Sequence, residues 1–231
     1  MAKDSPAPET LDYANLRVKY EHQPFLESEL AATPLAQFER WYADAVAAAI
    51  PEPNAMVVAT VGPDGAPSTR HVLMKAADER GFVFFTNYDS QKGRELAANP
   101  KVSLVFPWIA LFRQVVIQGV AERLSREESV AYFDSRPYGS RIGAWASRQS
   151  QPLSGLDEFE ARYQEFAELY PETGPVPTPP NWGGFLVRAH RVEFWAGHES
   201  RLHDRLRFET ATGESAPLAA AASWHVQRIF P

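Results

Sequence analysis

A segment near the C-terminal end of the chain, residues 201–208, concentrates positive charge in an acidic protein. Its sequence, RLHDRLRF, holds three arginines and a histidine, whereas the whole chain carries a formal net charge of −6 at pH 7. If the segment is a β-strand, alternation places Arg201, His203, Arg205 and Arg207 on one face. Two interpretations stay open. The segment is an exposed edge strand whose charges prevent pairing with other chains, or the repulsion between its positive side chains is offset by an anion or a carboxylate.

A second segment, YFDSRPYGS at 132–140, gathers groups that suit a phosphate. Tyr132 and Arg136 are four residues apart, which predicts one face of a helix that ends there. Pro137 suits the first turn of a new helix, and Ser140 follows in that turn. A helix N-terminus offers free N–H groups and a positive dipole end, and arginine pairs well with phosphate. A capped helix–helix corner, with its arginine on a surface carboxylate, explains the same residues equally well.

Two further segments place cations beside predicted turns. In TRHVLMK, Arg70 and Lys75 are five residues apart, so alternation along a flat strand places their side chains on opposite faces. They bind one ligand only if the strand is bulged or runs along the rim of a site. Otherwise both are surface cations whose apolar stems pack on the protein. In SQKGREL, Ser90 and Lys92 open a helix, which either binds a phosphate or is a solvated turn.

Uncharged side chains complete the set of candidates. Gln114 lies in a predicted strand among valines, where a buried amide needs a hydrogen-bond partner. Gln149 and Ser150 follow a predicted helix. Trp195 either stacks on a flat ring system or fills the core, and a core position is the commoner one.

Composition restricts the class of protein that these segments serve. The 231 residues are 45% hydrophobic and 23% charged, as in an ordinary soluble domain with one sizeable core. The pI near 5.6 argues against a nucleic-acid-binding protein. No secretory signal or membrane-spanning run is present, so we expect a cytoplasmic protein without a membrane partner. Cysteine is absent and the histidines lack the spacing of helical metal ligands, so we predict no metal site. The common nucleotide-binding and nucleophile motifs are also missing from the sequence.

The elements that must position these candidates are mostly strands. Hydrophobic spacing and capping signals predict helices over 34–50, 90–99, 125–136, 137–147 and 156–170. Apolar runs between turn signals predict strands over 55–61, 66–75, 82–87, 101–108, 113–124, 183–197, 201–208 and 223–229, with a break at 76–81. Strands do not alternate regularly with helices. The expected fold class is therefore mainly β with appended helices (α+β), an antiparallel barrel or sheet.

In this combination and order, the motifs resemble the pyridoxine (pyridoxamine) 5′-phosphate oxidase family. The likeness runs from EPNAMVVAT at 52–60 to the C-terminal RIFP, through RHVLMK, FFTNYDSQKGREL, YFDSRPYGSRIGAWASRQS, WGGF and EFWAGHESRLHDRLRF. The resemblance implies an FMN-binding split β-barrel and a homodimer with FMN at the subunit interface. It also implies oxidation of pyridoxamine or pyridoxine 5′-phosphate to pyridoxal 5′-phosphate, with O₂ as electron acceptor and H₂O₂ as product.

Two other functions compete with this one. A related flavin oxidase of phenazine biosynthesis shares stretches like SQKGREL and RLH, but Lys75, Tyr132, Arg136 and the GAW motif favour the vitamin B6 enzyme. A non-catalytic split-barrel protein that binds flavin or pyridoxal phosphate is the other alternative. The pair Arg201 and His203 argues against it.

The resemblance carries roles onto individual residues. As FMN contacts it implies Arg70, His71, Val72, Leu73, Lys75, Phe85, Thr86, Gln91, Lys92, Gln114, Gln149, Ser150, Trp195 and Arg205. As substrate contacts it implies Lys75, Tyr132, Arg136, Ser140, Arg201 and His203, and, from LRVKYE, Arg17 and Tyr20. As catalytic residues it implies Arg201 and His203, which hold the pyridine ring against the flavin.

Three positions depart from the family pattern. Gln91 replaces the usual arginine beside the FMN phosphate, which weakens or removes that contact, Phe85 replaces a common tyrosine, and the ending RIFP replaces RLAP. The expected layout is an N-terminal tail over 1–30, which includes a segment that covers the substrate, followed by one FMN-binding split-barrel domain over 31–231.

Overall fold

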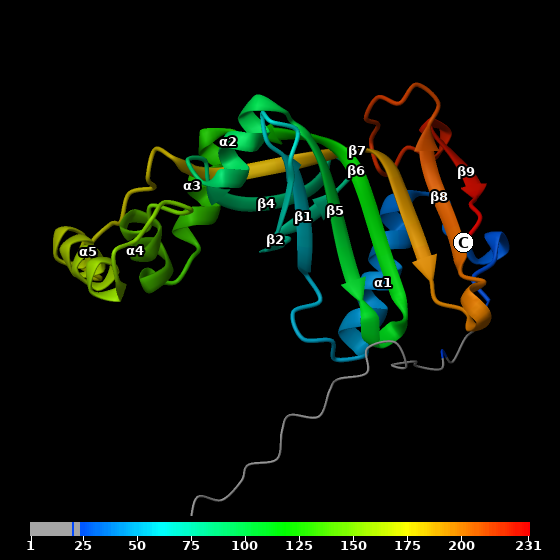
Figure 1. The fold of residues 1–231 in the computed structure, drawn as a ribbon, viewed down its shortest axis with the longest axis horizontal. Helices are drawn as coiled ribbons and strands as arrows, with labels where there is room; N and C mark the ends of the chain where they lie inside the picture. The colour runs from blue at the N-terminus through cyan, green and yellow to red at the C-terminus, as the bar shows by residue number, and fades with distance from the viewer. Residues whose placement is uncertain (1–19, 21–23) are drawn as a thin grey trace, which may run out of the picture.

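A nine-stranded antiparallel sheet forms the centre of the computed structural model, which describes residue 20 and residues 24–231 (Figure 1). The strand order is β2-β1-β5-β6-β7-β4-β3, with β8 paired to β7 and β9 paired to β8. The strands are β1 (Ala55–Val61), β2 (Pro67–Leu73), β3 (Ala76–Asp78), β4 (Gly81–Asn87), β5 (Lys101–Trp108), β6 (Arg113–Arg123), β7 (Trp182–Ala196), β8 (Asp204–Thr210) and β9 (Trp224–Arg228).

Five helices accompany the sheet in the part of the chain that the structure describes. They are α1 (Pro34–Ala47), α2 (Gln91–Ala98), α3 (Arg126–Asp134), α4 (Tyr138–Ala146) and α5 (Leu156–Leu169). One of them, α1, packs on a face of the sheet, and α3, α4 and α5 form a separate lobe at its end. Short 3₁₀ turns are η1 (Glu27–Glu29), η2 (Ile109–Leu111), η3 (Glu199–Arg201) and η4 (Ala221–Ser223). No helix among the described residues is both long enough and apolar enough to cross a membrane.

The main core forms where α1 packs on the sheet. The Thr33 side chain caps the helix by accepting a hydrogen bond from the Ala36 backbone N–H, and Pro34 occupies the first turn. Phe38 is buried at ring-centroid distances of 4.9 Å from Phe82 and 5.0 Å from Phe106. Burying one such side chain contributes roughly 1.5–3 kcal/mol, so α1 anchors the sheet.

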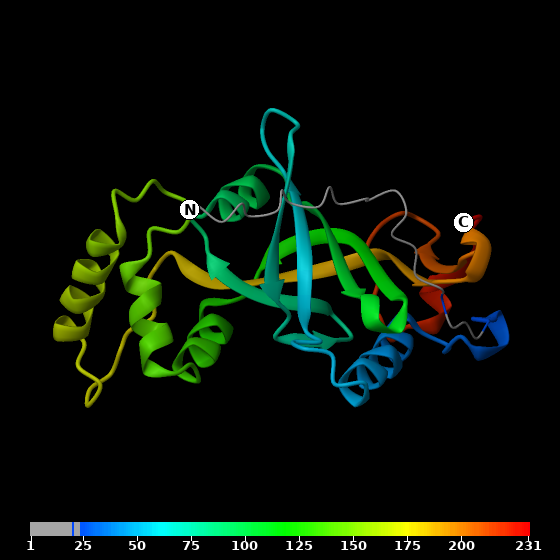
Figure 2. The same ribbon diagram turned by 60° about the horizontal axis from the view of Figure 1, so that its bottom comes forward.

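A second, smaller core holds the helical lobe of α3, α4 and α5. Its buried members are Phe133, Ile142, Val176 and Trp182. Trp182 is the first residue of β7, so this long strand belongs to both cores. Figure 2 shows β7 running across the molecule from the lobe to β8.

The sequence patterns predicted most local structure correctly. The expected mainly-β fold class with appended helices is confirmed by the single sheet and its five helices. Ser90 caps α2 by accepting from the Gly93 N–H, and Ser125 and Glu128 form the predicted capping box of α3. The break expected at 76–81 was wrong in part, because Ala76–Asp78 pairs with β4 as a short edge strand.

Two predictions about side-chain faces were wrong. Residues 201–208 are not one strand, because Ser200 and Arg201 have φ of 57° and 65°, in the left-handed region, and the strand begins only at Asp204. Arg136 does not lie on a helix face with Tyr132, since α3 ends at Asp134. The residue before a proline avoids helical conformation, which accounts for that early end.

Candidate active site

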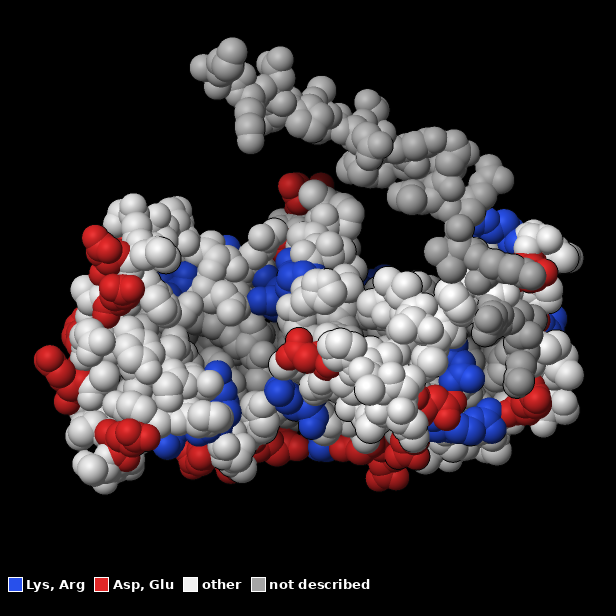
Figure 3. Space-filling view, turned by 90° about the horizontal axis from the view of Figure 1, so that it is seen from below, with Lys and Arg blue, Asp and Glu red and all other residues white. Residues whose placement is uncertain are grey.

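A cavity of about 620 Å³ lies between the sheet and the helical lobe. Figure 3 shows the hollow beside the lobe, with Lys and Arg side chains near its rim. The cations Lys75, Lys92 and Arg136 line it together with His71, and none of the described lining residues is Asp or Glu. In a chain with net charge −6, a cavity whose described charged lining residues are all cations predicts an anionic ligand.

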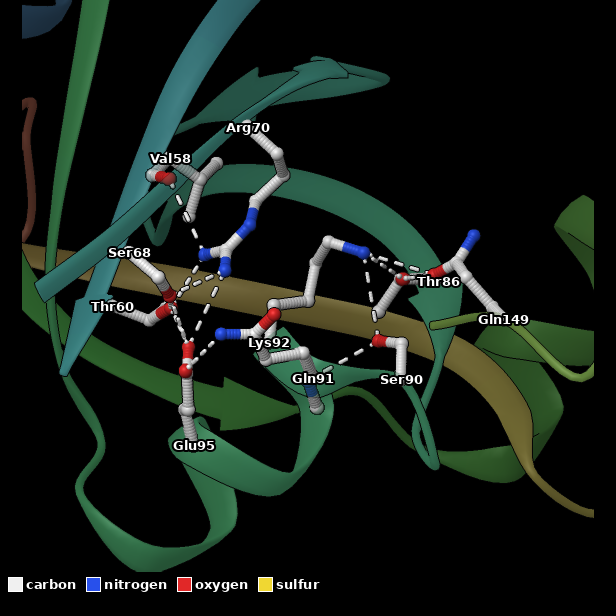
Figure 4. A network of polar contacts seen from close by, with 11 residues as sticks. Val58, Thr60, Ser68, Arg70, Thr86, Ser90, Gln91, Lys92, Glu95 and Gln149 are labelled. Atoms are coloured by element: carbon white, nitrogen blue, oxygen red, sulfur yellow. Dashed lines mark hydrogen bonds and ion pairs between the residues drawn. The ribbon is translucent and has the colours of Figure 1, made fainter. Parts of the chain in front are cut away.

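Lys92 is the most buried of these cations. It lies in the first turn of α2 and is only 7% exposed. Its Nζ donates hydrogen bonds to Gln149 Oε1 at 2.9 Å, to Thr86 Oγ1 at 3.3 Å and to Ser90 Oγ at 3.5 Å (Figure 4). Burial, with a smaller effect from Arg70, lowers the pKa of Lys92 to about 8. These three partners are neutral, so a bound anion would stabilise the ammonium.

Arg70 lies beside this site but is neutralised by a carboxylate. Its Nη2 is 3.3 Å from Glu95 Oε2 and 2.6 Å from Ser68 Oγ, and Thr60 accepts from Nη1 (Figure 4). Gln91 Nε2 donates to the other Glu95 oxygen at 2.9 Å. Burial alone would raise the pKa of Glu95, but hydrogen bonds from Ser68, Thr60 and Gln91 lower it to about 2. The charge of Arg70 is therefore already balanced, and Arg70 does not line the cavity.

Arg136 lines the opposite wall and lacks a partner for one nitrogen. Its guanidinium carbon lies 4.8 Å from the centre of the Trp182 ring. Its Nη1 is buried with no hydrogen-bond partner among the described residues, and burial lowers the pKa of Arg136. A buried, unpartnered donor costs free energy, so Arg136 would be stabilised by an acceptor that reaches this nitrogen.

The floor around Arg136 is aromatic and carries hydroxyl groups. The Tyr132 and Phe85 rings stack at a centroid distance of 4.0 Å, and Phe85 stacks on Trp182 at 5.4 Å. Ser140, in the first turn of α4, lines the same cavity. Tyr132 and Arg136 thus meet in one site although they do not share a helix face.

His203 belongs to a different cluster, at the β8 end of the molecule. Its ring lies 4.6 Å from the Trp195 ring and 5.9 Å from the Tyr20 ring. The backbone N–H of His198 donates to His203 Nδ1 at 3.0 Å, which leaves Nε2 as the donor in the neutral ring. Burial, helped by the charge of Arg201, lowers the pKa of His203. Arg201 itself is exposed on η3.

Arg205 and Arg207 share one face of β8, as alternation predicts, and meet a carboxylate there. Arg205 Nε donates to Glu193 Oε1 at 2.9 Å, and Arg207 Nε donates to Glu193 Oε2 at 3.1 Å. Arg205 also donates to the backbone oxygen of Phe230. Glu193 on β7 therefore offsets the repulsion between these two arginines, while Arg201 and His203 lie outside the strand.

The two clusters lie at opposite ends of β7. Trp182 is the first residue of β7 and lines the cavity, and Trp195 is the last but one residue of this strand. Figure 1 shows β7 between the helical lobe and β8. A strand rises about 3.3 Å per residue, so roughly 40 Å of strand separates these tryptophans. The cavity and His203 therefore lie apart within one chain.

Comparisons with known proteins show the family of this chain. A family model described as pyridoxamine 5′-phosphate oxidase matches residues 42–170, and one described as the pyridoxine 5′-phosphate oxidase C-terminal dimerisation region matches residues 182–231. The chain belongs to the pyridoxamine 5′-phosphate oxidase family. The resemblance inferred from the motifs is thereby confirmed, and membership makes the chain an oxidoreductase.

Two relatives match this chain over nearly its whole length. Pyridoxine/pyridoxamine 5′-phosphate oxidase of Bordetella pertussis is 55% identical over 96% of this chain and 100% of its own length. The protein of the same name from Streptomyces avermitilis is 51% identical over 95% and 96%. Among solved structures, PhzG from Burkholderia lata in complex with tetrahydrophenazine-1-carboxylic acid has a TM-score of 0.79 at 30% identity, covering 88% of this chain and 95% of PhzG.

The residues implied by the family pattern divide between the two clusters and a remainder. The cavity collects His71, Val72, Leu73, Lys75, Phe85, Thr86, Lys92, Tyr132, Arg136, Ser140 and Gln149. The β8 end collects Tyr20, Trp195, Arg201, His203 and Arg205, with Gln114 opposite Trp195 in the β6–β7 register. Gln114 is half-buried rather than buried. Arg70 and Gln91 lie in the Glu95 network, Ser150 follows Gln149 with φ of 68°, and Arg17 lies outside the described residues.

Sequence reasoning missed several members of this family site. Glu95 and Glu193, which pair with the arginines, stand inside the SQKGREL and EFWAG motifs, but nothing in those motifs marks them as charge partners. The small residues Gly143, Ala144 and Ser147 line the cavity; Gly143 and Ala144 were visible only as part of the GAW motif, and Ser147 looks like an ordinary turn residue in the sequence. Trp182 was visible only as part of the WGGF motif.

Proposed function

We propose that this enzyme oxidises pyridoxamine 5′-phosphate or pyridoxine 5′-phosphate to pyridoxal 5′-phosphate, with FMN as cofactor, O₂ as electron acceptor and H₂O₂ as product. The observation that carries the proposal is the cavity lined by Lys75, Lys92 and Arg136 without a described carboxylate. Two phosphates, one of the cofactor and one of the substrate, match this excess of positive charge. Relatives at 51–55% identity bear the name of this activity.

The residues present fit FMN. Lys92 supplies a buried ammonium at the start of a helix, where backbone N–H groups also face an anion. Thr86 and Gln149 add polar groups on the same wall. When bound, FMN supplies the redox chemistry by taking two electrons from the substrate and passing them to O₂. An FMN-binding protein of Nostoc punctiforme with a TM-score of 0.64 has the same fold.

The chain's own groups bind and orient the substrate. Arg136, with its unpartnered nitrogen over Trp182, binds the substrate phosphate together with the hydroxyl groups of Tyr132 and Ser140. Arg201 and His203 hold the pyridine ring, His203 through its Nε2 hydrogen and Arg201 through its charge. They reach the cavity from a second copy of the chain.

The homodimer is therefore part of the proposal. The C-terminal family model is described as a dimerisation region and includes Trp195, Arg201 and His203. We propose a two-fold dimer with FMN at the interface, so that each cavity is completed by the other chain's β8 end. We further propose a cytoplasmic protein without nucleic-acid or membrane partners. Residues 1–30 are the N-terminal tail, which includes a substrate-covering segment and whose Phe25 and Glu27 contact β8 and β9, and residues 31–231 are one split-barrel domain.

One experiment tests the function against its main alternative. The purified protein should be yellow, hold about one FMN per chain, behave as a dimer in light scattering, and release H₂O₂ when pyridoxamine phosphate is added in air. The PhzG structure favours the alternative of a flavin oxidase with a phenazine-type substrate. Turnover of tetrahydrophenazine-1-carboxylic acid but not of pyridoxamine phosphate would support it, and a colourless protein that FMN cannot saturate would overturn both.

FMN binding should weaken as pH rises through the pKa of Lys92. That pKa is about 8 in the ligand-free protein, and an anion favours the charged form, so binding above pH 8 takes up a proton. A phosphate monoester is already mostly a dianion at pH 7. We expect the dissociation constant to rise by about tenfold between about pH 7 and pH 9, measured by quenching of flavin fluorescence. Lys92→Met should bind weakly at both pH values and lose this dependence; an unchanged slope would remove Lys92 from the phosphate site.

A further inference from the structure

One arginine of the last strand ties together three segments that are far apart in the sequence. Arg228 Nη1 donates to Asp204 Oδ1 at 2.6 Å, at the start of β8. Its Nε and Nη2 donate to the two Glu27 oxygens at 2.7 and 2.9 Å, and Nη2 also donates to the Phe25 backbone oxygen at 3.0 Å. The guanidinium thus spans β9, β8 and the segment that precedes α1.

Arg228, Asp204 and Phe25 are each hydrogen-bonded to the other two. The Phe25 backbone N–H donates to Asp204 Oδ2 at 3.0 Å, so Asp204 accepts from both Arg228 and Phe25. Phe25 is 7% exposed and packs on Trp41 of α1 at a centroid distance of 4.9 Å. The hydrogen bond from Arg228 lowers the pKa of Glu27 to about 2 and holds it ionised. Asp204 is thereby fixed against the main core.

Asp204 is also the residue that ends the loop carrying the proposed catalytic groups. It directly follows His203, and Arg201 lies three residues before it. Both Ser200 and Arg201 have positive φ, a conformation that persists only where surrounding contacts determine it. At the other end of the loop, Gly197 N–H donates to the Phe112 backbone oxygen at 2.7 Å. Fixing Asp204 therefore fixes the second end of a strained loop.

We propose that Arg228 is a positioning residue, which holds Asp204 on residues 25–27 and so sets where Arg201 and His203 stand. It does not touch substrate or cofactor, and it acts through Asp204. The inference rests on the proposed function, because it assigns Arg228 a role toward Arg201 and His203. An ordinary surface ion pair would add little stability and would leave the loop where it is.

Arg80 provides a matched control for Arg228. It also pairs with two carboxylates from different elements, Asp78 at 3.0 Å and Glu128 at 2.8 Å, and its side chain is similarly exposed. None of Asp78, Arg80 and Glu128 lines the cavity. Arg228→Met and Arg80→Met each remove a guanidinium that pairs with two carboxylates. Of these two arginines, only Arg228 pairs with Asp204, which directly follows the loop of residues 198–203.

The test compares these two variants as flavin-loaded dimers. We expect Arg228→Met to lower kcat/KM for pyridoxamine phosphate by at least about tenfold, with flavin content and dimerisation retained, while Arg80→Met keeps wild-type kinetics. Asp204→Asn should act in the same direction, and Arg228→Lys should recover part of the loss. Hydrogen exchange at residues 198–203 should become faster in Arg228→Met and stay unchanged in Arg80→Met.

The hydrogen-exchange measurement separates two kinds of failure. If exchange at 198–203 does not change in Arg228→Met and its kinetics match those of Arg80→Met, Arg228 does not position the loop. If exchange does become faster while wild-type and variant are equally unable to oxidise pyridoxamine phosphate, the positioning role stands and the proposed function is wrong. If Arg228→Met loses its flavin or its fold, Arg228→Lys and Asp204→Asn supply the comparison with Arg80→Met.

Discussion

Replacing Arg201 by methionine is expected to lower kcat and kcat/KM together, by about ten- to a hundredfold, as the loss of a charge-assisted contact of roughly 1.5–3 kcal/mol requires. Methionine keeps much of the stem volume and removes the charge. It also has a Cβ, so the left-handed conformation of residue 201, with φ of 65°, is no more strained than in the wild type. Steady-state kinetics, with flavin content checked first, measures the effect.

His203→Ala should be milder and should act mainly on KM, because in the proposed function the ring positions the substrate through Nε2, while the His198 backbone N–H donates to Nδ1. Arg188→Met is a suitable control, since Arg188 is a partly exposed arginine of β7 whose nearest carboxylate lies 3.9 Å away. If Arg201→Met and His203→Ala keep the kinetics of this control, residues 201–203 are an ordinary charged turn with no role in catalysis.

Replacing Arg136 by alanine is expected to raise KM for the phosphorylated substrate by at least about tenfold, with unchanged FMN content. Arg136 has a buried Nη1 without a partner and a pKa lowered by burial. The unpartnered donor costs stability in the ligand-free protein, whereas the contact of the guanidinium with the Trp182 ring adds stability, so we expect little change in the melting temperature. A raised KM in a protein of normal stability would point to the substrate phosphate.

Arg141→Ala serves as the control for Arg136→Ala. Arg141 lies in α4, close in sequence, and its Nε is also buried without a hydrogen-bond partner in the part of the chain that the structure describes, but it does not line the cavity. Its removal should leave KM unchanged. Loss of FMN from Arg136→Ala with an unchanged KM would show that this arginine binds the cofactor phosphate instead.

Local signals in the sequence were sufficient for most elements of the fold. The Ser90 and Ser125 caps are satisfied by backbone groups three residues away, so their effect is visible in a short stretch of sequence. The strand alternation of AMVVATV and KVSLVFPW appears in the structure as alternating buried and half-buried residues. These features depend on neighbours in the chain, and for that reason a single sequence predicts them.

The sequence by itself determined the elements, the excess of cations at a few short segments and the family. Only the tertiary structure decided which cation faces the cavity. Lys92 and Arg70 both flank predicted turns, but Glu95 takes Arg70 into its network and leaves Lys92 with neutral partners. In the same way Glu193 reaches Arg207 because the β7–β8 register places them opposite each other. Charge partners of this kind are brought together by strand register and helix packing, which local residue patterns do not encode.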